Sequence, residues 1–279
     1  MKYFALLTVL LSAFVSADEI RVASWNIYWL GGSGHNDRTA SDYQKLTQYA
    51  SSLDADVIAL QEVEDATWAR KVFGDGYNYY FTSRRPDSKG LQRVGFAVRK
   101  GISVPDHQDY EQLGLDGSVR FGKDITISTD GGELRLLGVH LKSGCFSASL
   151  DSSKKACKKL NRQVPELEEW IDDRAEEGTP YVILGDFNRR LNLDIAGNKG
   201  VWKAIDDSHP TEFADLSNLA EGKTSSCWGG KYPQYIDHII VDPRAKGMYV
   251  SDTFGALNFS GQFDKMISDH CPIFASFSF

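Results

Sequence analysis

The chain has 279 residues, 42% of them hydrophobic, and its 31 Lys and Arg against 38 Asp and Glu give a net charge of −7. This hydrophobic content is enough for a sizeable core, and no Pro/Gly/Ser-rich linker or short repeat divides the chain, so we expect one domain over residues 18–279. The acidic balance argues against a protein that merely coats nucleic acid. It is compatible with phosphodiester hydrolysis if a bound cation and a local basic patch offset the field.

The N-terminal residues have the three parts of a secretory signal peptide. Lys2 supplies the positive charge, Phe4–Val15 is apolar, and Val15-Ser16-Ala17 is a small-residue cleavage site. The apolar run is shorter than the roughly 20 residues of a membrane span. We therefore expect residues 1–17 to be removed and the protein to be secreted or periplasmic. We also expect a monomer with no stable membrane insertion.

Hydrophobic periodicity predicts strands and helices spread over the whole chain. The expected strands are Ile20–Ile27, Asp56–Val63, Tyr77–Thr82, Val94–Arg99, Asp124–Ser128, Glu133–Leu141, Tyr181–Leu184, Tyr235–Val241, Met248–Phe254 and Pro272–Phe277. The expected helices are Thr39–Leu53, Asp65–Val72 and Leu160–Ile171, the last containing Pro165 and followed by a C-cap at Gly178. This mixture indicates an α/β class with sheet at the centre and helices outside.

Four cysteines in an exported chain indicate disulfides. Cys145 and Cys157 are close together in a polar Ser/Lys-rich stretch, so we expect them to close one loop. Two alternatives remain for Cys271, which either pairs with Cys227 or stays a buried free thiol at the start of an apolar strand.

Polar residues with possible chemistry follow several predicted strands, where loops usually carry functional sites. Asp186 and Asn188 are two apart, so an extended backbone would place both on one face, able to hold a water, a metal or a phosphate oxygen. Taken alone, the same Gly-Asp-Phe-Asn stretch would also suit a turn.

Asp237 interrupts an apolar strand, where an ionised carboxylate is costly unless it is paired or bound to a metal. His238 is adjacent and should point the other way, so we expect it to be structural. His270 is the better partner, because a carboxylate fixes the tautomer of an imidazole and stabilises its charged form. Glu62 also ends a buried strand, and its chemical match is a hard divalent cation, whose shell Asn26 and Asp269 would complete.

Six motifs in order resemble the endonuclease/exonuclease/phosphatase superfamily. They are Ser24-Trp25-Asn26, Gln61-Glu62-Val63, Val139-His140-Leu141-Lys142-Ser143, Gly185-Asp186-Phe187-Asn188, Ile236-Asp237-His238 and Ser268-Asp269-His270. The resemblance runs from about Ile20 to Phe279. It implies a four-layer α/β/β/α sandwich in which two mixed β-sheets pack face to face with helices outside.

The resemblance also implies roles for individual residues. Asn26 and Glu62, helped by Asp269, would bind Mg²⁺ or Mn²⁺, with Ca²⁺ a further option. Asp186 and Asn188 would position the attacking water and the phosphate, Asp237 would orient His270, and His140 would be an acid or a phosphate ligand. Arg120 would contact phosphate, although it lacks the proline often found beside the family's arginine. Lys142 and Arg189 are further candidate phosphate contacts, and for the Arg189-Arg190 pair a solvated surface is the alternative.

The implied reaction is in-line attack of water on a phosphodiester, assisted by a cation. The proton of the water would pass either to the Asp237–His270 pair or to Asp186, and the sequence leaves both alternatives open. We expect a nuclease with DNA or RNA as its substrate. One alternative is a phosphodiesterase or phosphatase acting on lipid headgroups or small phosphate esters. A second is a binding protein that keeps the fold without catalysis, which the joint presence of Glu62, Asp186, Asn188, Asp237 and His270 disfavours.

Overall fold

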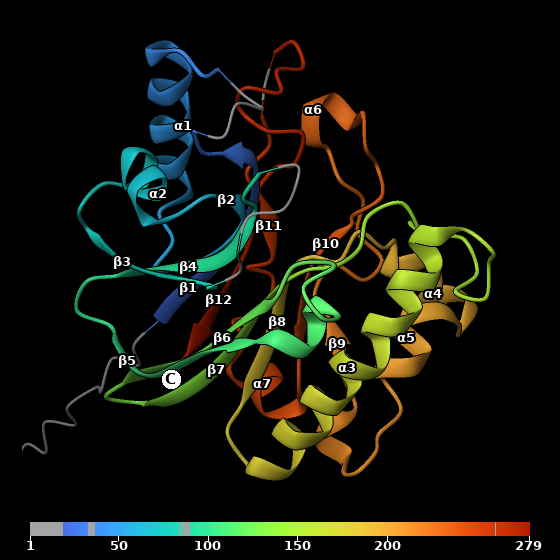
Figure 1. Ribbon diagram of the computed structural model, residues 1–279. Coiled ribbons are helices and arrows are strands. Elements are labelled where there is room, and N and C mark those ends of the chain that lie inside the picture. The colour runs from blue at the N-terminus through green and yellow to red at the C-terminus, as the bar shows by residue number, and fades with distance from the viewer. Residues whose placement is uncertain (1–18, 33–36, 84, 86–89, 260) are drawn as a thin grey trace, which may run out of the picture.

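Two six-stranded sheets stack face to face, with helices on both outer faces (Figure 1). A computed structural model describes residues 19–32, 37–83, 85, 90–259 and 261–279. The predicted signal peptide, residues 1–17, lies outside these residues. The arrangement confirms the four-layer α/β/β/α sandwich and the mixed α/β class.

The first sheet has the strand order β11-β12-β1-β2-β4-β3, and the second has the order β5-β6-β7-β8-β10-β9. The first contains β1 Glu19–Leu30, β2 Val57–Val63, β3 Tyr77–Phe81, β4 Arg93–Arg99, β11 Gly255–Ala256 and β12 Ile273–Ser278. The second contains β5 Ser103–Tyr110, β6 Gly122–Thr129, β7 Gly132–His140, β8 Tyr181–Asp186, β9 Ser217–Asn218 and β10 Asp237–Val241. Both sheets are mixed, because β1 runs parallel to β2, and β7 to β8, among antiparallel pairs.

Helices cover the outer face of each sheet. The α-helices are α1 Ala40–Leu53, α2 Ala66–Phe73, α3 Lys155–Glu177, α4 Leu191–Gly197, α5 Gly200–Ile205, α6 Cys227–Gly230 and α7 Pro243–Met248, with 3₁₀ turns η1 Glu111–Gly114 and η2 Glu212–Ala214. Figure 1 shows α1 and α2 beside the first sheet and α3, α4 and α5 beside the second. Thr39 caps α1 through a capping box with Asp42, which explains why the helix begins where the sequence predicted.

Alternation along the strands separates three apolar layers. In β1, Val22 faces the other sheet, whereas Ala23 and Trp25 face α1 and α2. In β8, Val182 joins the same layer between the sheets, whereas Ile183 packs under α3. Strands buried on both faces have near-continuous apolar sequences, which is why the sequence revealed them.

Some predicted elements were wrong or missing. Met248–Phe254 is not a strand. Pro243 and the N-cap Asp242 instead begin α7, and after its end at Met248 the chain turns before the short β11. Strand β5 was not predicted, because it is a polar edge strand with no buried residue and therefore no hydrophobic pattern. Helix α3 is longer than predicted and contains Pro165, with Gly178 as its left-handed C-cap.

Both candidate disulfides are present. Cys145 pairs with Cys157 as expected, and Cys227 pairs with Cys271, which settles the alternative left open for Cys271. Two disulfides fit an extracellular protein. Within the described part of the chain, no helix has the length and apolar character needed to cross a bilayer.

Candidate active site

The candidate site lies where the apolar layer between the sheets ends and its inward-facing positions become polar. Every second side chain of a strand points to the same face. Asn26 therefore faces the same layer as Val22 on β1, and Asp186 faces the same layer as Val182 on β8. Asn26 Nδ2 donates to Asp186 Oδ2 at 3.0 Å, so the two sheets meet through this contact. The same alternation brings His140 from β7 and Asp237 from β10 into the site.

Glu62 reaches the site through a break in alternation. The pairing of β2 with β4 shifts between Gln61 and Val63, and Glu62 has φ of +61°. A non-glycine residue in this left-handed region is a strained conformation that tends to occur at functional sites. The Glu62 carboxylate accepts from the backbone N–H of Trp29 at 3.2 Å and lies 3.4 Å from Asn26 Nδ2. In a regular strand Gln61 and Glu62 would point to opposite faces. The irregular backbone at Glu62 instead lets its carboxylate reach the site.

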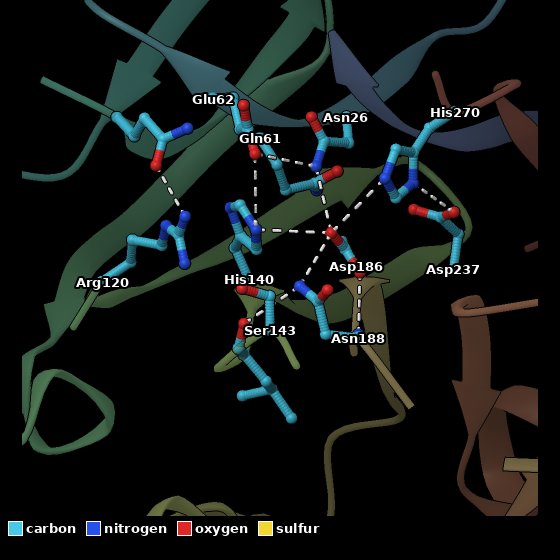
Figure 2. Close-up of polar contacts among 12 residues, drawn as sticks. Asn26, Gln61, Glu62, Arg120, His140, Ser143, Asp186, Asn188, Asp237 and His270 are labelled. Carbon is cyan, nitrogen blue, oxygen red and sulfur yellow. Dashed lines mark hydrogen bonds and ion pairs between the residues drawn. The ribbon is translucent and has the colours of Figure 1, made fainter. Parts of the chain in front are cut away.

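Asp186 Oδ2 is the centre of the polar cluster, as Figure 2 shows. The Nδ2 atoms of Asn26 and Asn188 each lie 3.0 Å from this oxygen. His140 Nε2 lies 3.3 Å from it and His270 Nε2 3.9 Å. Burial raises the pKa of Asp186 to about 7; the nearby His270 opposes the rise and Asp237 adds to it.

Asn188 is fixed in position by its own backbone. Its N–H donates to Asp186 Oδ1 at 2.7 Å and its side-chain amide donates to the Leu141 carbonyl at 3.1 Å, with φ of +51°. The turn expected from the Gly-Asp-Phe-Asn stretch is present, and it brings the side chain of Asn188 back onto Asp186.

His270 is held by Asp237 from another part of the chain. His270 Nδ1 lies 2.7 Å from Asp237 Oδ2, and Ser268 Oγ accepts from the His270 N–H while donating to the Asn26 carbonyl. Burial lowers the pKa of His270, but the charges of Asp237 and Asp186 outweigh burial and raise it well above 6.5.

These groups open into a pocket of about 580 Å³. Its lining includes the predicted residues Glu62, Arg120, His140, Asp186, Asn188, Asp237, Asp269 and His270. Asn26 is buried behind it and acts through its contacts with Asp186 and Glu62. Arg120 donates to Gln92 Oε1 at 2.6 Å, and its charge opposes the rise that burial causes in the pKa of Glu62.

Two predicted phosphate contacts do not line this pocket. Arg189 is 1% exposed, and its guanidinium forms an ion pair with Asp194 at 2.8 Å, so the expected phosphate contact is wrong for this residue. Its neighbour Arg190 lines the pocket instead. Lys142 Nζ lies 2.9 Å from the Ser143 carbonyl, outside the pocket lining. His238 is structural as expected, buried between Asn218 and the Arg189 carbonyl.

The donor atoms suit a divalent cation that prefers oxygen. The side chains of Asn26 and Glu62 are adjacent, as predicted. Burial is the main cause of the raised pKa of Glu62, and the nearby charge of Asp269 adds to the rise. One ligand atom each from Asp186, Asp237 and His270 also lie within 4.8 Å of one another. Asp237 Oδ1 is buried without a hydrogen-bond partner among the described residues. A cation would compensate this concentration of buried carboxylate oxygen.

The sequence did not reveal the aromatic and basic residues of the outer wall. Tyr28, Phe146, Lys231 and Tyr232 line the pocket. Phe146 is next to Cys145, and Tyr232 follows Cys227 by five positions. Their closeness to the two disulfides was the one sequence feature that could have indicated a fixed position for these aromatic residues.

The stacked sheets and the pocket at their common end define a four-layer sandwich protein whose polar residues converge from both sheets. The chain belongs to the Endonuclease/Exonuclease/phosphatase family, whose model matches residues 23–270. No curated protein sequence matches significantly.

Several solved structures share the fold at low sequence identity. Truncated TDP2 from Caenorhabditis elegans is 18% identical with a TM-score of 0.61, and the alignment covers 93% of this chain and 97% of that one. The human Nocturnin catalytic domain, solved with a bound sulfate anion, is 16% identical with a TM-score of 0.62, covering 93% and 94%. The Xenopus laevis APE2 catalytic domain is 17% identical with a TM-score of 0.59, covering 93% of each chain.

Proposed function

We propose that this protein is a secreted, divalent-metal-dependent phosphodiesterase that hydrolyses nucleic acid. The observation that carries the proposal is the set of four side-chain nitrogen atoms around Asp186 Oδ2, from Asn26, Asn188, His140 and His270, of which the last three line the pocket and Asn26 lies behind it. Such an arrangement places charged and hydrogen-bonding groups around one reacting position.

Asn26, Glu62 and Asp269 would hold the cation, with Asp186 beside them. A bound Mg²⁺, or Mn²⁺ or Ca²⁺ in its place, would neutralise charge on the phosphate during hydrolysis.

Asp186 is assigned as the acceptor of the proton from the attacking water. The amides of Asn26 and Asn188 hold Oδ2 in place, and a carboxylate fixed in this way can accept a proton from a water beside it. His270, fixed by Asp237, directs Nε2 toward the same oxygen, and its charged form would attract a phosphate oxygen. Arg120 and Arg190 on the pocket wall would bind further phosphate oxygens.

Nucleic acid is favoured as the substrate because basic side chains lie on the wall of this pocket although the whole chain is acidic.

The test is a panel of a supercoiled plasmid, labelled DNA and RNA oligonucleotides, sphingomyelin vesicles and bis-nitrophenyl phosphate, each with Mg²⁺ or with EDTA. We expect Mg²⁺-dependent cleavage of the nucleic acids, with loss of most activity in Asp186→Ala and none in His107→Ala, a histidine exposed on β5. Hydrolysis of sphingomyelin alone would instead support the lipid alternative. Export is tested by N-terminal sequencing of the mature protein, which should begin at Asp18.

A further inference from the structure

Two of the exposed large apolar side chains stand on the wall of the catalytic pocket. Among the described residues these exposed side chains are Phe146, Leu193 and Tyr232, at 39%, 39% and 44%. Phe146 and Tyr232 line the pocket, whereas Leu193 does not. Single exposed apolar side chains are normal on a protein surface, but exposed apolar surface in a ligand-binding groove marks an interaction site, so the place of these two rings on the pocket wall points to a ligand.

Phe146 lies on a backbone that is fixed from several sides. Its carbonyl accepts from the Arg190 N–H at 2.8 Å, and the buried Arg189 guanidinium donates to the carbonyls of Cys145 and Ala148 at 2.8 and 2.6 Å. The Cys145–Cys157 disulfide closes the same loop. The arginine that the sequence suggested for phosphate binding therefore holds the Phe146 loop instead.

Tyr232 is connected to the loop that carries His270. Its ring packs edge-on against Phe263, with centroids 6.2 Å apart, and Phe263 packs in the same way against Trp228. Trp228 Nε1 donates to the Ser268 carbonyl at 2.9 Å, and the Cys227–Cys271 disulfide joins the two segments. Tyr232 nevertheless stays exposed, so part of its ring is accessible to another partner.

Each of these aromatic residues is next to a basic residue of the same pocket. The backbone N–H of Arg190 donates to the Phe146 carbonyl, and both residues line the pocket. Lys231 precedes Tyr232, with Nζ 5.4 Å from the centroid of that ring. Proteins that bind single strands alternate aromatic rings, on which bases stack, with cations for the phosphates. Bases within a duplex already stack on their neighbours, so such rings select unpaired bases.

We propose that Phe146 and Tyr232 stack on unpaired bases on either side of the scissile phosphodiester, so that the protein acts on single strands in preference to duplexes. This inference rests on the proposed function and specifies its substrate class. Base stacking on an aromatic side chain corresponds to about a fivefold to hundredfold change in binding for each base.

The experiment compares two single-stranded polymers of equal length and charge with Mg²⁺ present. One is a thymidine oligonucleotide, and the other is a tetrahydrofuran-phosphate chain without bases. A blunt duplex of the same length is the third substrate. Because two stacked bases would each contribute about fivefold to hundredfold, we expect the wild type to cleave the thymidine strand with a kcat/KM about 25-fold to 10⁴-fold above that for the base-free chain, mainly through a lower KM. The duplex should also be cleaved less efficiently than the thymidine strand.

Phe146→Leu and Tyr232→Leu should each reduce this preference for bases by about fivefold to hundredfold, because cleavage of the thymidine strand falls much more than cleavage of the base-free chain. Tyr232→Phe, which keeps the ring, should retain the preference. Leu193→Ala is the matched control, because it removes an equally exposed side chain outside the pocket. Thermal unfolding of each variant would show that the fold is intact.

Equal cleavage of the base-bearing and base-free strands by the wild type would overturn the inference and leave the proposed function standing. The inference would also be overturned if both leucine variants kept the wild-type preference for the base-bearing strand. The same holds if these variants changed only the hydrolysis of sphingomyelin vesicles. Absence of cleavage of every polymer would overturn the proposed function and this inference with it.

Discussion

His270 Nδ1 lies 2.7 Å from Asp237 Oδ2, although 33 positions separate the two residues in sequence. Asp237 begins β10 of the second sheet, and His270 precedes β12 of the first, so this contact joins the two sheets at the pocket. The carboxylate fixes the imidazole and, with Asp186, keeps its pKa well above 6.5 against the opposing effect of burial.

Asp237→Asn should reduce kcat on an oligonucleotide by about 10²- to 10⁴-fold, because the imidazole loses the partner that orients it. His270→Ala should have a similar effect. The double variant should be little worse than either single variant, since residues that act as a unit are not additive. An NMR titration of Asp237→Asn should also show a lower pKa for His270. Full additivity of the two losses would contradict the pairing.

Removal of the cation should abolish activity and also change stability. We expect Mg²⁺ to raise the melting temperature of the EDTA-treated wild type, since a ligand that binds only the folded state stabilises it, by about 2.7 kcal/mol at 100 times its Kd. Glu62→Gln should lose most of this shift. Glu133→Gln, an exposed glutamate on β7, is the control and should keep it. An unchanged shift in Glu62→Gln would remove Glu62 from the cation site.

The two disulfides should differ in their contribution to stability. The Cys227–Cys271 pair closes 44 residues and Cys145–Cys157 closes 12. From loop-closure entropy, replacing each pair with serines should cost about 4 and about 3 kcal/mol respectively. Urea unfolding of the two double variants measures this order. A larger loss for the shorter loop would show that native contacts, rather than chain entropy, dominate.

His238 should make the protein sensitive to acid. Burial lowers its pKa to about 4, and its neutral ring pairs with Asn218 and the Arg189 carbonyl. The unfolded chain takes up this proton near pH 6.5 and the folded chain only near 4. Stability is therefore present above pH 6.5 and falls by about 3 kcal/mol as the pH decreases to 4.

The measurement is urea unfolding of the wild type and His238→Gln between pH 7 and 4, with EDTA present. The glutamine does not titrate, so the stability advantage of the wild type should shrink as the pH falls. If the difference in unfolding free energy between the wild type and His238→Gln stayed constant across this range, His238 would have the same pKa in the folded and unfolded states.

Strands buried on both faces were predictable because their apolar runs are short and bounded by polar residues, which favours a buried strand over a helix. The exposed β5 and the short helices α4–α7 were not, because a polar edge strand and a one- or two-turn helix leave little hydrophobic pattern. Met248–Phe254 was mistaken for a strand because its apolar residues pack against the core, although they lie at the end of α7 and in the turn that follows it.

The amino-acid sequence by itself determined the sheet-rich class, the family motifs and which carboxylates required a partner, because alternation and the cost of burying charge are local properties. Only the tertiary structure decided which oxygen lies at the centre of the pocket, that Arg189 is buried while Arg190 faces the pocket, and that Phe146 and Tyr232 share its wall. Those outcomes depend on the stacking of two sheets and on single-residue changes of direction at strand ends. Neither leaves a periodic pattern in the chain.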